Sequence, residues 1–314
     1  MKKVLLILVA VIGFVACHKD NNSGENDDNS GNKWVQKKNY PGAQNDRPVA
    51  FSVNNKIYAL SSTNLWEYNP TSDTWTEKSF PNIADNTFIT TSTCFVINNK
   101  AYIIDEYNKT WIPGGSAYNF PVWEYNPIAD DWTKKTACPI IVSTYQCSWG
   151  GTVLSHSNFG FSINNKGYAG NMGGAFYEYN PETNTWKQCA NAGGHEGIIR
   201  GATEEHGFTI GGRNCSYYAS TFRIYNPDTD KWTPKANFPT AIQQGIAFCK
   251  DGVIYAGLGS PGTGKDIYKY NNDNNSWNYA IEAPIERSGA IAVMCNGKLY
   301  LGLGGNIDFW EYTF

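Results

Sequence analysis

A tyrosine followed seven residues later by a tryptophan recurs five times, and this repeat constrains the fold more than any other feature of the chain. The copies begin at Leu65, Val122, Phe176, Phe222 and Ile267 and read LWEYNPTSDTW, VWEYNPIADDW, FYEYNPETNTW, FRIYNPDTDKW and IYKYNNDNNSW. A sixth copy begins as FWEYTF at Phe309. Self-similarity at intervals of roughly 40–50 residues is typical of propellers and solenoids. Apolar and polar residues alternate within each copy, which predicts short strands and not helices.

A second recurring piece lies upstream of each copy. It reads FSVNNKIYAL from Phe51, FVINNKAYII from Phe95, FSINNKGYAG from Phe161, GVIYAGLG from Gly252 and GKLYLGLGG from Gly297. Asn-Asn and Asn-Gly between apolar runs predict two-residue hairpin turns, because both residues tolerate a positive φ. Each unit therefore contains two hairpin-linked strands, a variable loop, a strand with the tyrosine and a strand with the tryptophan. Four antiparallel strands of this kind form one propeller blade.

The two ends of the domain complete one blade between them. The segment from Lys33 to Pro41 (KWVQKKNYP) matches the tryptophan strands of the repeats, whereas the sixth copy has no tryptophan after Tyr312. We expect the strand around Trp34 to be the fourth strand of the last blade, with Ser288–Phe314 supplying the other three. Such closure leaves no open sheet edge between the first and last blades. The prediction is an all-β domain over residues 33–314, a six-bladed propeller with four antiparallel strands per blade.

The units resemble kelch repeats, which carry a diglycine after the second strand and a Tyr and a Trp at fixed spacing. Gly173-Gly174, Gly211-Gly212 and Gly304-Gly305 keep the diglycine, whereas Ser61-Ser62, Asp105-Glu106 and Gly259-Ser260 stand in that region of the other units. The resemblance covers about residues 33–314 and implies a kelch-type propeller, related to the central domain of galactose oxidases. It implies no particular activity, because one fold hosts many functions.

The N-terminal residues resemble a bacterial lipoprotein leader. Lys2 and Lys3 precede an apolar run, Val4–Ala16, that is too short to span a bilayer comfortably, so residues 1–16 are expected to be a signal peptide. The run ends in FVAC, similar to a lipobox with Phe14 in place of the usual Leu, which implies lipidation of Cys17. Residues 17–32 lack apolar side chains after the cysteine and are expected to form a flexible tether. An ordinary cleaved signal peptide is the alternative.

The lipoprotein resemblance implies a cell-envelope location. His18, and not Asp, follows the cysteine, which in lipoproteins favours the outer membrane, and the acidic tether is similar to surface-export signals of Bacteroidota lipoproteins. Whether the domain faces the periplasm or the outside stays open. The formal net charge is −3 and the domain has no basic run, so nucleic acid is not an expected partner.

Cysteine usage predicts neither a metal site nor a disulfide framework. Without Cys17 the count is odd, so at least one thiol is free. Cys94, Cys249 and Cys295 fall in apolar strands and are expected to be small buried hydrophobes. Cys138 and Cys147 are the candidate disulfide pair. No paired Cys/His spacing indicates zinc, and we expect no metal and no cofactor.

Function is expected where the chain departs from its own repeat. Residues 105–121 are an insertion between the second and third strands of blade 2, and residues 140–158 connect blade 2 to blade 3. Because strand direction alternates within a blade, both insertions rise from one face. They carry aromatic side chains that we expect to stack on a sugar ring: Tyr107, Trp111, Tyr118, Phe120, Tyr145 and Trp149, with His156 beside them. The alternative is that the loops form a small core of their own.

The same face is expected to carry further candidate residues. Blade 4 contributes Arg213, Tyr217 and Tyr218, and blade 5 contributes residues 262–265. Residues that lead into first strands are expected to ring the mouth of the central channel: Arg47, His195, Glu196, Gln243 and Arg287. Arg200, Glu204 and Glu205 are predicted to lie within the first strand of blade 4, where charged side chains line a wet channel or form ion pairs.

Three functions are compatible with these features. The copper site of kelch-type galactose oxidases needs two histidines, two tyrosines and a cross-linked cysteine, and one of the histidines comes from a separate C-terminal domain. The histidines that follow the tether here are only His156, His195 and His206. Copper-dependent oxidation is therefore not expected. Exported six-bladed kelch proteins also include sialic acid mutarotases, and Glu204 or Glu205 with Arg213 is the alternative catalytic set. We expect a lipid-anchored, non-catalytic module whose partner is a glycan or small-molecule ligand, with a protein-interaction scaffold as the other alternative.

Overall fold

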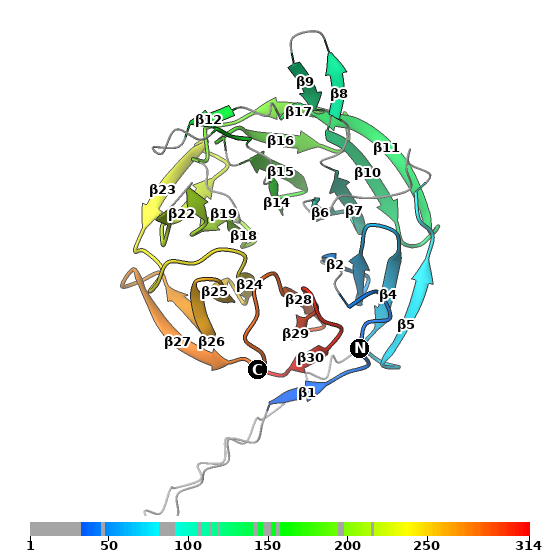
Figure 1. Cartoon of the computed structure of the whole chain (residues 1–314), viewed down its shortest axis with the longest axis vertical. Helices are drawn as coiled ribbons and strands as arrows, with labels where there is room; N and C mark the ends of the chain where they lie inside the picture. Colours follow the sequence, from blue (N-terminus) through cyan, green and yellow to red (C-terminus); the bar gives the residue numbers. More distant parts are fainter. Residues whose placement is uncertain are drawn as a thin grey trace, which may run out of the picture. The chain divides into compact units, whose positions relative to one another are not determined.

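Six four-stranded antiparallel sheets surround a central axis as the blades of a propeller (Figure 1). The structure is a computed structural model, and all described residues lie in one unit, Lys33–Phe314. The described residues are 33–44, 48–81, 92–105, 109–112, 115–118, 120–140, 144–146, 152–154, 158–171, 173–193, 198–214 and 217–314. They contain strands and turns but no helix, as the alternating pattern predicted, and hence no helix that could cross a membrane.

The strands follow the predicted order within each blade, from the channel outward. Blades 1 to 3 are β2 (Val49–Val53), β3 (Lys56–Leu60), β4 (Leu65–Asn69), β5 (Thr74–Lys78); β6 (Thr93–Ile97), β7 (Lys100–Ile104), β10 (Phe120–Asn126), β11 (Asp131–Cys138); β14 (Asn158–Ile163), β15 (Lys166–Asn171), β16 (Phe176–Asn180), β17 (Thr185–Gln188). Blades 4 and 5 are β18 (Ile199–Ala202), β19 (Gly207–Ile210), β22 (Phe222–Asn226), β23 (Lys231–Lys235); β24 (Ile246–Lys250), β25 (Val253–Gly259), β26 (Gly262–Asn271), β27 (Ser276–Glu282).

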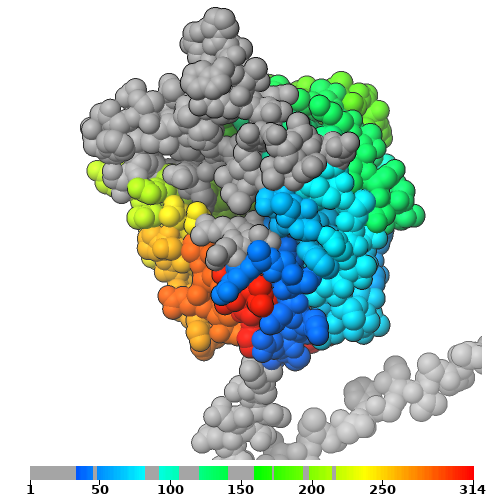
Figure 2. All heavy atoms as spheres, turned by 45° about the vertical axis from the view of Figure 1, so that its right-hand side comes forward, coloured from blue at the N-terminus to red at the C-terminus, as the bar shows by residue number. Residues whose placement is uncertain are grey.

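Blade 6 is completed by the N-terminal strand, as the sequence predicted. Its order is β28 (Ile291–Cys295), β29 (Lys298–Gly302), β30 (Phe309–Tyr312) and then β1 (Trp34–Gln36), which pairs antiparallel with β30 so that Trp34 lies opposite Tyr312. The Trp34 Nε1–H donates to the carbonyl of Glu282 in blade 5 at 2.7 Å. Figure 2 shows the blue and red ends of the domain packed together on the surface. The strand thus closes both the blade and the ring.

The two ends of the channel differ in how the chain turns. The turns between first and second strands all lie at one end, which we call the hairpin face. Three of them are Asn-Asn pairs with positive φ at both residues, at 54–55, 98–99 and 164–165, which confirms the predicted two-residue turns. The opposite end, which we call the loop face, carries the connections between second and third strands and between blades.

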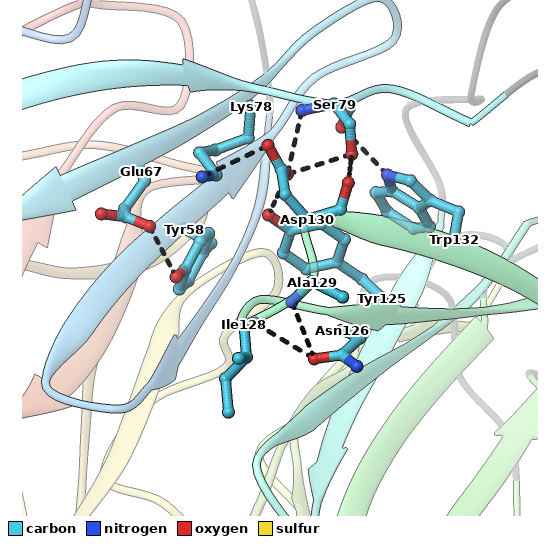
Figure 3. Close-up of polar contacts among 10 residues, drawn as sticks. All are labelled: Tyr58, Glu67, Lys78, Ser79, Tyr125, Asn126, Ile128, Ala129, Asp130 and Trp132. Carbon is cyan, nitrogen blue, oxygen red and sulfur yellow. Dashed lines mark hydrogen bonds and ion pairs between the residues drawn. The ribbon is translucent and has the colours of Figure 1, made fainter.

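The repeated Tyr–Trp motif joins each blade to the preceding one. At the seam between blades 1 and 2, the Tyr125 hydroxyl donates to Asp130 Oδ1 at 2.7 Å, and the same oxygen accepts the Ser79 N–H at 3.1 Å. The Trp132 Nε1–H donates to the Ser79 carbonyl at 2.9 Å (Figure 3). The same clamp recurs with Lys38, Tyr68, Asp73 and Trp75; Thr136, Tyr179, Asn184 and Trp186; Ala190, Tyr225, Asp230 and Trp232; and Ala236, Tyr270, Asn275 and Trp277. The motif is therefore structural.

The clamp predicts a defined acid sensitivity. Burial opposes ionisation of Asp73 and Asp130, but hydrogen bonds from backbone N–H groups and tyrosine hydroxyls outweigh it, and the pKa of each carboxyl lies below its ordinary value of 3.8. A lowered folded-state pKa gives stability above the unfolded-state value that is lost as the pH falls through the folded-state value. We expect Asp73→Asn/Asp130→Asn to fold, because Asn184 and Asn275 hold the same place.

At pH 7 this double variant should lose less than about 1 kcal/mol per site, as for partly exposed ion pairs. Between pH 5 and pH 3 its melting temperature should fall less than that of the wild type, measured by circular dichroism. Asp228→Asn, an exposed aspartate in the equivalent turn of blade 4 and outside the clamp, is the control. An equally steep fall in the wild type and the double variant would contradict the role of the clamp carboxylates.

The described cysteines are free thiols. Cys295 is buried, as predicted, whereas Cys94 and Cys249 are only half-buried. Burial raises the pKa of the Cys94 thiol to about 12. Of the candidate disulfide pair, Cys147 lies outside the described residues. Cys138 is a free thiol buried in the core between blades 2 and 3, opposite Phe120 at the end of β11, which argues against the bridge.

Candidate functional site

The first strands of the six blades border the central channel (Figure 1). Each second strand carries one aromatic residue that pairs with a first-strand residue, and these pairs give equivalent positions in the six blades. The first-strand residues of the pairs, in blades 1 to 6, are Phe51, Phe95, Phe161, Gly201, Phe248 and Val293. The residues just before these positions form one layer of the channel wall: Ala50, Cys94, Gly160, Arg200, Ala247 and Ala292. Five blades place a small residue in this layer, and blade 4 alone places a long cation.

Alternate residues of the first strands face the channel. Phe51, Phe95, Phe161, Phe248 and Val293 are buried between blades. The residues in the layer of Arg200 are partly exposed, with the exception of Gly160. The residues of the next layer are also partly exposed: Ser52, Val96, Ser162, Ala202, Cys249 and Met294. Because successive side chains of a strand point to opposite sides, these two layers are the channel wall. The six first strands carry no acidic residue.

The guanidinium of Arg200 is the only cation of these two layers. Arg200 is partly exposed, and within the described part of the chain it has neither a hydrogen bond nor an ion pair. Burial lowers its pKa from the ordinary value, and the group that acts against this shift is Cys94, two blades away. Arg200 precedes Gly201, which pairs with Phe208, so strand alternation puts its side chain on the channel side of blade 4. Its predicted position on the innermost strand is confirmed, although it was not among the predicted site residues.

Glu204 and Glu205 lie outside the first strand, contrary to the prediction. β18 ends at Ala202, and residues 203–206 form a turn closed by the Thr203 N–H and the His206 carbonyl at 2.8 Å. Both glutamates are exposed on the hairpin face. Arg213 follows β19 at the loop face, so the length of β19, roughly 13 Å at 3.3 Å per residue, separates it from them. The structure therefore does not bring the alternative catalytic set together.

Blade 4 presents aromatic residues on the loop face, as predicted. β20 (Arg213–Asn214) and β21 (Tyr217–Tyr218) form a small hairpin between β19 and β22. Tyr217 is 72% exposed and Tyr218 is 42% exposed. The Arg213 guanidinium lies over the Tyr218 ring, 5.6 Å from its centroid, which restrains that ring. Arg213 and Tyr218 are thus the predicted site residues that the structure shows in contact.

Two further predicted residues have structural roles. The Arg287 guanidinium donates to the Leu303 carbonyl at 2.8 Å and to Asp308 Oδ1 at 2.7 Å, so it secures the loop before β30. Phe120 is fully buried in the core between blades 2 and 3 because it opens β10, and it is not a loop aromatic. Cys17, Arg47, Tyr107, Trp149, His156, His195 and Glu196 lie outside the described residues.

Two more hairpins arise on the loop face. β8 (Lys109–Ile112) and β9 (Gly115–Tyr118) lie between β7 and β10, where the insertion of residues 105–121 was predicted. β12 (Thr144–Gln146) and β13 (Thr152–Leu154) lie between β11 and β14. Trp111, Tyr118 and Tyr145 belong to these strands. All three two-stranded sheets of the described chain therefore arise from connections at one end of the channel.

The described side chains contain no group of three His, Cys, Asp or Glu residues placed to hold a metal ion. No family model matches the chain, and no curated protein has a matching sequence. Among solved structures, the chain is similar to that of YjhT, with a TM-score of 0.66 at 14% sequence identity over 87% of this chain and 95% of the other. At this identity the similarity establishes the fold alone, a six-bladed β-propeller.

Proposed function

We propose that the protein is a non-catalytic ligand-binding propeller of the kelch type, with its ligand site on the loop face. The observation that carries this proposal is the difference between the two faces. Every additional hairpin of the described chain rises from the loop face, whereas the hairpin face has short turns of two to four residues. Loops on a rigid scaffold are where binding residues concentrate.

The ligand class that we propose for the loop face is a glycan. Tyr217 and Tyr218 expose large ring surfaces, and Arg213 holds one ring in place. Aromatic rings stack on the apolar C–H face of a sugar, and a restrained ring loses less conformational entropy on binding. Trp111, Tyr118 and Tyr145 on β8, β9 and β12, with Tyr107 and Trp149, would extend this surface. Arg47, His195 and Glu196 are proposed to line the mouth beside it.

The position of Lys33 fits a tethered protein. Its carbonyl accepts the Thr313 N–H, just beyond the Trp34–Tyr312 pair, so Lys33 lies at the hairpin end of blade 6. A tether that joins the domain there leaves the loop face at the opposite end of the channel. We propose that the domain is anchored at this end, through a lipid on Cys17, to the outer membrane.

Removal of the exposed tyrosines tests the glycan site. We expect Tyr217→Ala/Tyr218→Ala to weaken glycan binding about tenfold, because stacked aromatic contacts contribute roughly 0.5–1.5 kcal/mol each. The measurement is a glycan-array screen of the mature protein, followed by titration calorimetry with the best glycan. Tyr279→Ala is the matched control, because Tyr279 is 55% exposed on the outer strand of blade 5. Equal affinities of the double variant and the wild type, or no glycan bound by the wild type, would overturn the glycan proposal.

A further inference from the structure

Arg200 is not required by the architecture of the ring. The equivalent position is Ala in blades 1, 5 and 6, Cys in blade 2 and Gly in blade 3, and these blades keep the same strand pairing. A small residue therefore suffices to build this layer of the channel. The arginine adds a charged group that makes no hydrogen bond or ion pair within the described residues.

No described acidic side chain neutralises that charge. Glu204 and Glu205 are exposed at the hairpin face. Burial is the main cause that raises the pKa of Cys249 in blade 5, and the Glu204 carboxylate adds to it in a smaller measure. At the loop face Asp308 is paired with Arg287. Asp105 is buried and accepts the Ser92 hydroxyl at 3.2 Å.

The channel lowers the hydration of the Arg200 guanidinium, and among the described residues no acceptor is hydrogen-bonded to it in place of the lost water. Burial is the first cause of the lowered pKa of Arg200, which agrees with a loss of hydration at the guanidinium. A desolvated, unpaired charge is unfavourable by itself, so its natural complement is an anion supplied by a ligand. Apart from Val96 and Met294, the side chains of the two wall layers around it are small.

We propose that Arg200 binds the carboxylate group of a small organic molecule inside the central channel. A guanidinium presents a planar fork of N–H donors that matches the two oxygens of a carboxylate. One cation balances one negative charge, which favours a carboxylate over a sulfate or phosphate dianion in this partly desolvated place. The methyl and thiol groups of Ala50, Cys94, Ala247 and Ala292 offer apolar contact to the rest of the molecule. This site is independent of the glycan surface proposed above.

Titration with simple anions tests the proposal. Sodium acetate, sodium glucuronate and sodium sulfate are added to the mature protein at constant ionic strength, with chloride as the balancing anion, and binding is followed by NMR chemical shifts. We expect saturable binding of acetate and glucuronate to the wild type. Arg200→Ala should weaken it roughly ten- to a hundredfold, the range for hydrogen bonds to charged groups. Arg200→Lys should restore part of the affinity, because it keeps the charge and loses the fork.

Two controls separate this site from other effects. Lys231→Gln removes a positive charge from the exposed outer strand of the same blade and should leave both affinities unchanged. Tyr217→Ala/Tyr218→Ala should bind acetate like the wild type even if glycan binding is lost. Equal titrations of Arg200→Ala and the wild type would overturn the site. Tighter binding of sulfate than of acetate and glucuronate would overturn its assignment to carboxylates.

Discussion

Trp34→Ala is expected to lower the free energy of unfolding by about 3–5 kcal/mol, the usual range for removal of a buried tryptophan. Trp34 is 8% exposed and packs with residues of blades 5 and 6, including Ile281 and Leu299. Its ring lies 4.8 Å from that of Tyr312, and its Nε1–H bonds to the Glu282 carbonyl. Loss of this side chain weakens the strand that closes the ring, so the whole domain should become less stable and not only its end.

Chemical denaturation followed by tryptophan fluorescence measures this effect. Val35→Ala is the matched control, because Val35 lies on the same strand, is 52% exposed and should change stability by no more than about 0.5 kcal/mol. A Trp34→Ala protein that unfolds at the same denaturant concentration as Val35→Ala would show that β1 is not needed to hold the ring.

Arg200→Ala is expected to raise the melting temperature of the ligand-free protein. The substitution removes a desolvated charge without a described partner and installs the residue that blades 1, 5 and 6 already carry at this place. Relief of an unpaired charge should stabilise the domain by about 1 kcal/mol or more. A binding residue that reduces stability is the usual compromise of a functional site.

Differential scanning calorimetry with and without glucuronate measures this second effect. A ligand that binds only the folded state stabilises it by RT ln(1 + [L]/Kd). Glucuronate should therefore raise the melting temperature of the wild type more than that of Arg200→Ala, and so narrow the difference between the two melting temperatures. A variant that melts below the wild type in the absence of ligand would show that Arg200 has a structural partner, which contradicts our account.

Most of the architecture could be predicted from the sequence, because its signals are local and repeated. The Asn-Asn pairs specify hairpin turns with positive φ, and the structure has them at the predicted places. The unfinished motif at Tyr312 and the isolated Trp34 predicted the closing strand, and these two residues pair directly. The Asp or Asn five residues after each tyrosine was visible only as a turn residue, and its role in joining blades needed the structure.

The site was harder to predict, because strand ends and side-chain directions are set by tertiary contacts. Glu204 and Glu205 were assigned to a strand, but β18 is short and a four-residue turn places both at the hairpin face. Phe120 was counted with the loop, yet β10 begins there and buries it. Arg200 carried a usable signal, since an alignment of the six first strands shows one arginine among small residues. Its lack of a described partner became clear only with the blades around the channel.

The most direct test of the account is the NMR spectrum of the arginine side chains during titration with acetate. If recognition takes place in the channel, the Nε–H signal of Arg200, assigned through Arg200→Ala, should shift and saturate. The signals of Arg223 and Arg287, which donate to Ala192 and to Leu303 and Asp308, should stay in place. An Arg200 signal that does not move, or shifts of equal size and without saturation at all three arginines, would contradict a carboxylate site in the channel.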